Sequence, residues 1–181
     1  LISSASGYGL SSILLSAIIK LSSQIEARRG LKPDKVLEVI AKDVTPQIKN
    51  NDEASLFYAV VDRRTFEMEY SHIGSIRAYI QVAGKDSLTD LALPLPGLKK
   101  DSKTEMQSKL VQLNSRDRLI FATDGVTGVK SPSGEVWGES GLISAIRQAP
   151  KSGVHELRNE ILFQAEKHSG KNTPERDQTL V

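Results

Sequence analysis

Apolar residues near the start of the chain recur every three or four positions, which is the spacing of one face of an α-helix. This spacing predicts one amphipathic helix over residues 8–28, ending before Gly30. Pro33 suits the first turn of a second helix, which Pro46 should end. The predicted apolar face of the first helix contains Leu10, Leu14, Ala17, Ile18, Leu21 and Ile25, and that of the second contains Val36, Leu37, Ile40 and Val44.

After residue 50 the pattern changes to short runs rich in β-branched and aromatic residues, which favour strands. Three such runs separated by short turns predict an antiparallel β-meander. Residues 84–107 contain Pro94 and Pro96 and little periodicity, so they are predicted to be mostly loop. The predicted strands are 56–61, 68–73, 77–82, 109–113, 118–123 and the start of a last one at 177–181, and the later helices are 141–148 and 154–168.

Helices and strands therefore occupy separate stretches of the chain, which favours α+β layers over alternating βαβ units. The length of 181 residues suits one domain, and 39% hydrophobic residues can form a sizeable core. The formal charge of +2 is too balanced to predict a nucleic-acid partner. The absence of cysteine excludes disulfides and thiolate metal sites, and it is compatible with a cytoplasmic location.

No signal-peptide pattern precedes the first predicted helix. No apolar stretch reaches the ~18 residues that a membrane span needs. The chain starts at Leu1 without Met, and this start is interpreted as a cut into a longer protein.

The segment from Leu119 to Val126 is the clearest candidate for chemistry. An apolar strand there delivers Asp124, and Gly125 allows the chain to turn sharply. Hard divalent cations prefer carboxylates that are held rigidly in this way. An Asp-Gly pair after a strand is also a common turn without a ligand role. Both interpretations stay open on this segment alone.

Five segments in order resemble the SpoIIE-like branch of the metal-dependent (PPM-type) protein serine/threonine phosphatases. Thr123–Val126 is similar to the family's Thr-Asp-Gly-Val strand end, and Ser133–Gly138 is similar to the Gly-Glu-hydrophobic-aromatic-Gly turn that follows it. The other matches are Leu56–Asp62 with Tyr70–Gly74, Leu93–Leu98 and Asp177–Val181. The resemblance therefore covers nearly the whole chain.

The resemblance implies a four-layer α-β-β-α sandwich of two antiparallel sheets, with the N-terminal strands missing. Its first helix is expected to pack on a sheet that contains both 56–61 and 118–123. Residues 1–181 are expected to form a single phosphatase domain that is truncated at the N-terminus, and truncation at the C-terminus stays open.

The resemblance also implies a metal site. In this family two Mn²⁺ or Mg²⁺ ions activate a water that attacks phosphoserine or phosphothreonine directly, so no residue acts as a nucleophile. Matched by position, Asp124 and Asp177 correspond to two of the metal-binding aspartates.

The N-terminal segment departs from the family pattern. Residues 2–10 resemble the motif hydrophobic-x-Asp-x-x-Gly-His-Gly-Leu, with Ser4 at the bridging aspartate and Tyr8 at the histidine. Ala5 still offers a backbone carbonyl to a metal, and Gly7 and Gly9 are candidates for binding phosphate on backbone amides. A neutral hydroxyl is a poor substitute for a carboxylate between two cations, so weak or partial metal binding is expected.

Two functions follow from the resemblance, and whether the chain is an enzyme stays open between them. The first is a bacterial phosphoserine/phosphothreonine protein phosphatase with an impaired metal site, acting in partner switching or signalling. The second is an inactive pseudophosphatase that binds a signalling partner. Both imply a phosphorylated protein partner, such as an anti-sigma-factor antagonist, together with an upstream sensor or regulatory domain and the option of a homodimer. A generic α+β domain with accidental matches is the third alternative.

The remaining polar candidates are interpreted as structural. His72, His155 and His168 lie far apart without metal-binding spacing, and they are expected to be surface or packing residues. Ser3, Ser4 and Ser6 have no partnered histidine, which disfavours a serine nucleophile.

Overall fold

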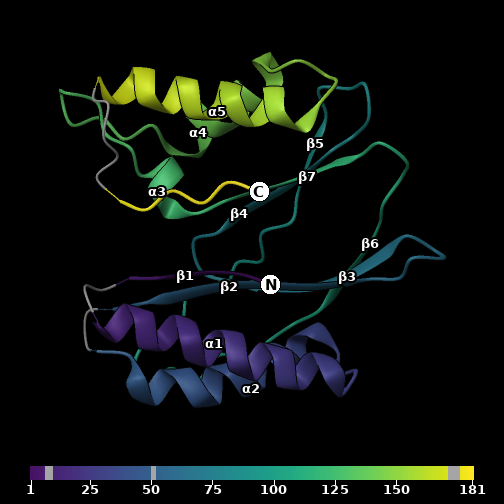
Figure 1. The fold of residues 1–181 in the computed structure, drawn as a ribbon, viewed down its shortest axis with the longest axis vertical. Coiled ribbons are helices and arrows are strands. Elements are labelled where there is room, and N and C mark those ends of the chain that lie inside the picture. The colour runs from purple at the N-terminus through teal and green to yellow at the C-terminus, as the bar shows by residue number, and fades with distance from the viewer. Residues whose placement is uncertain (7–9, 50–51, 171–175) are drawn as a thin grey trace. The chain divides into compact units, whose positions relative to one another are not determined.

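The computed structural model describes residues 1–6, 10–49, 52–170 and 176–181. They form two compact units, each with one antiparallel sheet and its own helices (Figure 1). The first unit is Leu1–Ile76 with Ala92–Leu113, and the second is Arg77–Leu91 with Asn114–Val181. The predicted α+β class with two antiparallel sheets is confirmed. The stacking of one sheet on the other stays a prediction.

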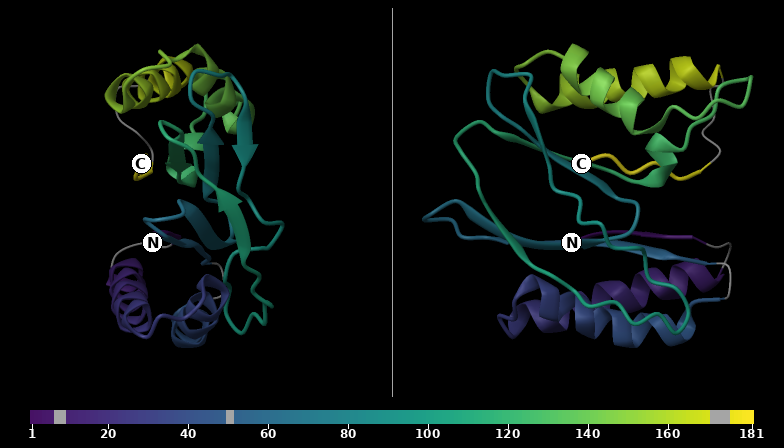
Figure 2. Two further views of the ribbon diagram at one scale, coloured as in Figure 1. Left: turned by 90° about the vertical axis from the view of Figure 1, so that its right-hand side faces the viewer. Right: turned by 180° about the vertical axis from the view of Figure 1, so that it is seen from behind.

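The first unit contains a four-stranded sheet in the order β1-β2-β3-β6. Helices α1 (Leu10–Arg28) and α2 (Pro33–Val44) lie along one face of this sheet (Figures 1 and 2), and the short 3₁₀ helix η1 (Thr45–Gln47) follows α2. The strands are β1 (Ile2–Ala5), β2 (Ala54–Val61), β3 (Glu67–Ile73) and β6 (Lys109–Gln112). Both predicted helices are confirmed, although residues 8 and 9 of the first lie outside the described residues.

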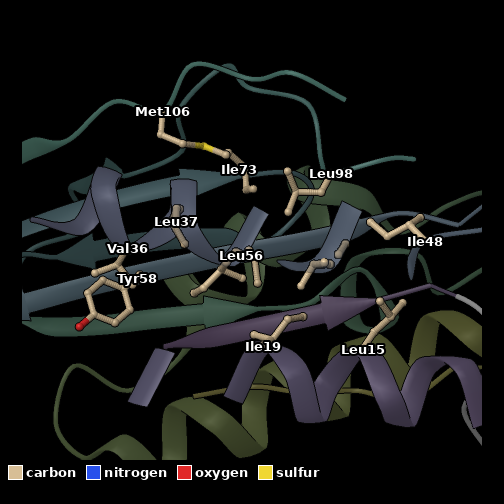
Figure 3. Packing of buried hydrophobic residues seen from close by; sticks show 13 residues of the cluster. Leu15, Ile19, Val36, Leu37, Ile48, Leu56, Tyr58, Ile73, Leu98 and Met106 are labelled. Carbon is tan, nitrogen blue, oxygen red and sulfur yellow. The ribbon is translucent and has the colours of Figure 1, made fainter. Parts of the chain in front are cut away.

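The core of the first unit forms where α2 covers the middle of the sheet. Figure 3 shows Val36 and Leu37 of α2 beside Leu56 and Tyr58 of β2, with Ile73 of β3 close by. The four apolar residues predicted for the buried face of α2 are fully buried. Five of the remaining positions of α2 carry the charged residues Asp34, Lys35, Glu38, Lys42 and Asp43, so its pattern favours burial of one face.

The predicted buried face of α1 is largely wrong, because among its described side chains only Ile18 packs against the core. Leu14, Leu21 and Ile25 are 53%, 60% and 54% exposed, while the core contains Leu15 and Ile19. In the first half of α1, apolar residues occupy positions on most sides of the helix itself. Helical spacing alone therefore does not show which face is buried. The small side chains of Ser22 and Ser23 are buried instead, and Ser22 Oγ donates to Asp43 Oδ2 of α2 at 2.6 Å. Contacts with α2 and with β1 therefore decide which face of α1 turns inward.

The predicted three-strand meander is also wrong. β2 and β3 pair as expected, but β4 (Arg77–Gln81) pairs with β7 (Arg118–Ala122) in the sheet of the second unit. The chain leaves β3 through Gly74, which has a φ of +86° and lies against Ser55 so closely that no Cβ would fit. Gly74 N–H donates to Leu95 O instead of continuing the β-ladder. This bend separates two strands that only three residues connect.

The second unit contains a three-stranded sheet in the order β5-β4-β7, with β5 at Leu88–Asp90 inside the predicted loop. Its helices are α3 (Asp124–Thr127), α4 (Gly138–Gln148) and α5 (Val154–Ser169). The predicted last strand contributes one bridge, Leu180 to Ala122, and Val181 exchanges two backbone hydrogen bonds with Phe121. Because β7 belongs to this sheet, the expectation that α1 packs on one sheet containing both 56–61 and 118–123 is wrong.

No helix within the described ranges is both long enough and apolar enough to span a membrane.

Candidate metal and phosphate site

Asp124 begins the short helix α3 directly after β7, as the sequence predicts. Thr123, the residue between them, both donates a hydrogen bond to the C-terminal segment and accepts one from it. Its N–H donates to Thr179 O at 3.1 Å, and its Oγ1 accepts from Thr179 N at 3.1 Å. These bonds fix residues 177–180 alongside the start of α3.

The backbone of Asp177 approaches α3 at Gly125. A Cβ built at Gly125 would lie far inside 3.0 Å of Asp177 O, a separation that real Cβ atoms essentially never show. Gln178 Nε2 donates to Gly125 O at 3.3 Å and holds the same contact. The two predicted aspartates, Asp124 and Asp177, therefore belong to adjacent segments of the second unit, and only glycine at 125 permits this approach.

Arg176 is the residue of this region that the sequence interpretation did not select. Its Nη1 lies 3.0 Å from Asp124 Oδ2, and the two side chains are 69% and 37% exposed. The signal available in the sequence was a basic residue directly before the predicted ligand Asp177. A guanidinium group is a strong partner for a carboxylate and cannot ligate a metal.

Ser4 and Ala5 lie in β1 of the first unit, opposite Ser55 and Ala54 of β2. Both are half-buried, and the side chain of Ser4 offers a hydroxyl without a formal charge. Gly7 and Gly9 lie outside the described residues. The convergence of Ser4 with Asp124 and Asp177 stays a prediction.

The described residues do not fit a site for two divalent ions. Mg²⁺ and Mn²⁺ prefer oxygen ligands, and a single Mg²⁺ is usually held by one or two carboxylates together with waters and substrate phosphate, so a pair of ions needs more carboxylates than one ion does. Within residues 1–6, 10–49, 52–170 and 176–181, no group of three or more His, Cys, Asp or Glu side chains is arranged to hold a metal. Asp124 and Asp177 supply at most two negative charges against the four positive charges of two divalent ions. The carboxylate of Asp124 also contacts a cationic side chain of the protein itself.

Other ionisable groups of the second unit serve its packing. Tyr79 OH donates to Glu139 Oε1 at 2.6 Å, and Arg77 Nη1 lies 3.3 Å from Glu139 Oε2. Burial and this hydrogen bond raise the pKa of Tyr79, so the phenol stays protonated and links β4 to α4.

Asp117 holds the turn before β7. Burial acts to raise its pKa, but backbone hydrogen bonds from Ala83 and Asn114 outweigh this effect and lower the pKa below its ordinary value. The charged carboxylate of Asp117 therefore stabilises the turn.

A cavity of about 220 Å³ in the second unit contains none of the predicted site residues. Its walls come from β7, α5 and the C-terminal residues Leu180 and Val181, and they include the guanidinium of Arg118. Arg118 Nη1 donates to the carbonyl oxygens of Pro150 and Gly153, both at 2.9 Å, and burial lowers its pKa. The guanidinium of Arg118 is thus held by backbone carbonyls of the same unit.

The histidine interpretation holds where the structure describes a contact. His72 is buried, stacks at an angle on Phe57, and accepts a hydrogen bond on Nδ1 from Leu93 N at 3.0 Å. His168 Nε2 lies 2.9 Å from Glu135 O at the surface. Both are packing or surface residues, as expected.

Comparison with known proteins supplies the family. The model of the family described as Stage II sporulation protein E (SpoIIE) matches residues 1–181. The phosphoserine phosphatase RsbP of Bacillus subtilis (strain 168) is 26% identical over 161 residues, which cover 86% of this chain. The chain spans only 38% of the length of that relative.

Solved structures share the fold at low identity. The RsbU and RsbW domains of Rv1364c from Mycobacterium tuberculosis match with a TM-score of 0.78 and 17% identity, covering 98% of this chain and 50% of that one. The SiaA-PP2C domain of Pseudomonas aeruginosa matches with a TM-score of 0.77 and 17% identity, covering 98% and 71%. A third match, the catalytic domain of the phosphatase PstP, is in complex with two manganese ions and has a TM-score of 0.64 at 14% identity, covering 98% and 83%. The fold is shared with these PP2C-type phosphatase domains, and the match of the family model over residues 1–181 shows that this chain belongs to the SpoIIE family.

Proposed function

We propose that this chain is a signalling domain with a phosphatase fold that recognises a protein carrying phosphoserine or phosphothreonine and hydrolyses the ester slowly or not at all. The observation that carries the proposal is the incomplete ligand set within a family of phosphatases. Ser4 stands at the position of an expected bridging aspartate, and no described group of three acidic or histidine side chains is arranged for a metal.

Two forms of the proposal differ in residual activity. In the first, Asp124 and Asp177 bind one Mn²⁺ or Mg²⁺ weakly, Ala5 adds a carbonyl, and a slow phosphatase remains. In the second, the chain is a pseudophosphatase that keeps only the partner surface. The ion pair between Arg176 and Asp124 favours the second form, because a protein cation already neutralises the carboxylate that the first form needs.

The partner is proposed to be a phosphorylated regulator in a bacterial partner-switching pathway, such as an anti-sigma-factor antagonist. The support is that the curated relative is named a phosphoserine phosphatase and that a matched solved chain combines RsbU and RsbW domains. A cytoplasmic location, an upstream sensor domain and a homodimer belong to the same proposal. Gly7 and Gly9 are proposed to contact the phosphate through backbone amides.

The test is phosphate release from a phosphoserine protein across a Mn²⁺ titration. The unmodified chain is expected to bind Mn²⁺ weakly and to release phosphate slowly. Ser4→Asp is expected to raise Mn²⁺ affinity, and turnover in a chain extended upstream, because a second fixed carboxylate can bridge cations. Asp124→Asn and Asp177→Asn are expected to abolish any activity. Rapid turnover by the unmodified chain that is insensitive to Asp124→Asn would refute the proposal.

A further inference from the structure

The segment that carries Arg176 is anchored, so the position of its guanidinium follows from the fold. Thr179 exchanges hydrogen bonds with Thr123, and Gln178 donates to Gly125 O. These contacts lie on Gln178 and Thr179, the residues two and three positions after Arg176. The backbone at 176 is therefore held within reach of α3, whatever the rotamer of the arginine.

The ion pair itself is exposed, and exposed ion pairs contribute little to stability. The ion pair matters because Arg176 competes with metal ions for the carboxylate of Asp124. A tethered cation acts at a high effective concentration, whereas a metal ion must come from solution. A divalent ion bound to Asp124 would also lie within a few ångströms of the guanidinium, where like charges repel.

We infer that Arg176 is a built-in cation for Asp124, occupying the carboxylate that a divalent metal would need and suppressing metal binding at this position. The inference concerns the same carboxylate as the proposed function, but it does not depend on whether the chain retains phosphatase activity. It assigns to Arg176 a role that the two candidate aspartates alone do not reveal.

The inference predicts that the positive charge of residue 176 controls Mn²⁺ affinity. Arg176→Gln removes the positive charge and keeps an unbranched polar side chain, so Mn²⁺ affinity is expected to rise by about tenfold or more. Arg176→Lys keeps the charge, so Mn²⁺ affinity is expected to stay near that of the unmodified chain. Arg158→Gln is the matched control, since Arg158 is exposed in the same unit and its guanidinium donates to Asn159 Oδ1.

The experiment is isothermal titration calorimetry of the full chain and its variants with Mn²⁺ alone, together with the Mn²⁺-dependent shift in melting temperature. The affinity gained in Arg176→Gln is expected to disappear in the double variant Arg176→Gln/Asp124→Asn, which assigns the gain to Asp124. Melting curves without metal establish that each variant is folded, and Arg176→Ala provides a second charge-free variant.

The inference is overturned if both charge-free variants bind Mn²⁺ no better than the unmodified chain, or if Arg158→Gln gives the same gain. It is equally overturned if the gain survives Asp124→Asn. These readouts are separate from turnover. Rapid phosphate release by the unmodified chain would refute the proposed function, whereas an unchanged Mn²⁺ affinity in Arg176→Gln refutes only the role of Arg176.

Discussion

Replacement of Gly125 by alanine separates local helix propensity from tertiary contact at the candidate site. Gly125 is a buried residue within α3, and its φ is not in the left-handed region. Helix propensity alone predicts that Gly125→Ala stabilises the protein by up to about 1 kcal/mol. The structure predicts the opposite sign, because the new Cβ would collide with the carbonyl oxygen of Asp177. That atom is backbone, so it cannot move aside as a flexible side chain can.

The magnitude follows from the hydrogen bonds that the displaced segment would lose. The two shorter bonds between Thr123 and Thr179, both 3.1 Å, and the bond from Gln178 Nε2 to Gly125 O are the ones that count here. At about 1 kcal/mol net for each bond, the loss is about 3 kcal/mol. Subtracting the gain in helix propensity leaves a destabilisation of about 2 kcal/mol, which lowers the melting temperature by roughly 4–8 °C for a chain of this length.

The assay is urea and thermal unfolding, combined with amide hydrogen exchange at Thr179. Gly84→Ala is the control, because Gly84 has a φ of +68° but open space around it, so only a backbone cost of about 1 kcal/mol is expected. Faster exchange at Thr179 is expected in Gly125→Ala and not in Gly84→Ala. If Gly125→Ala is instead more stable than the unmodified chain, with exchange at Thr179 unchanged, the close approach of Asp177 to α3 is wrong.

Two further predictions concern the two faces of α1 and the turn before β7. Ile19→Ala is expected to cost about 2–5 kcal/mol, since Ile19 is 1% exposed, whereas Leu21→Ala is expected to cost less than about 0.5 kcal/mol. Equal costs in urea unfolding would contradict the assigned face. The lowered pKa of Asp117 means that its stabilisation is present above the unfolded value of about 3.9 and is lost as the pH falls through the folded pKa. Asp117→Asn should therefore reduce stability at pH 7 and flatten the stability profile below about pH 4, and an unchanged profile in acid titrations would count against this role.

Much of the local structure was predictable from the sequence, because local pattern and chemistry determine it. α2 has a single apolar face between charged positions, so its buried residues were assigned correctly. The run of apolar residues at 56–61 predicted β2, and the apolar strand before Asp124 predicted β7 and the place of the candidate ligand. Asp62 Oδ1 accepts hydrogen bonds from Arg64 N and Thr65 N, which is the turn chemistry expected between two strands.

The features that the sequence did not decide all depend on contacts between distant segments. α1 is apolar on more than one side, and its contacts with α2 and with β1 select Leu15 and Ile19 for the core. Three neighbouring runs were predicted to pair in order, yet the bend at Gly74 sends β4 to another sheet. Helical spacing and strand propensity describe a few consecutive residues, so they contain no information about which partner a strand finds.

The candidate site shows the same division. The sequence placed Asp124 at the end of a strand and selected Asp177 by resemblance, and the same resemblance puts Ser4 where a carboxylate is expected. It did not reveal that Arg176 reaches Asp124, because 52 residues separate the two. That pair depends on the C-terminal segment lying against β7 and α3, held by backbone hydrogen bonds at Thr123 and by the absence of a side chain at Gly125. Sequence determined which charges the site contains, and tertiary structure decided which of them meet, because backbone pairing between distant segments sets those distances.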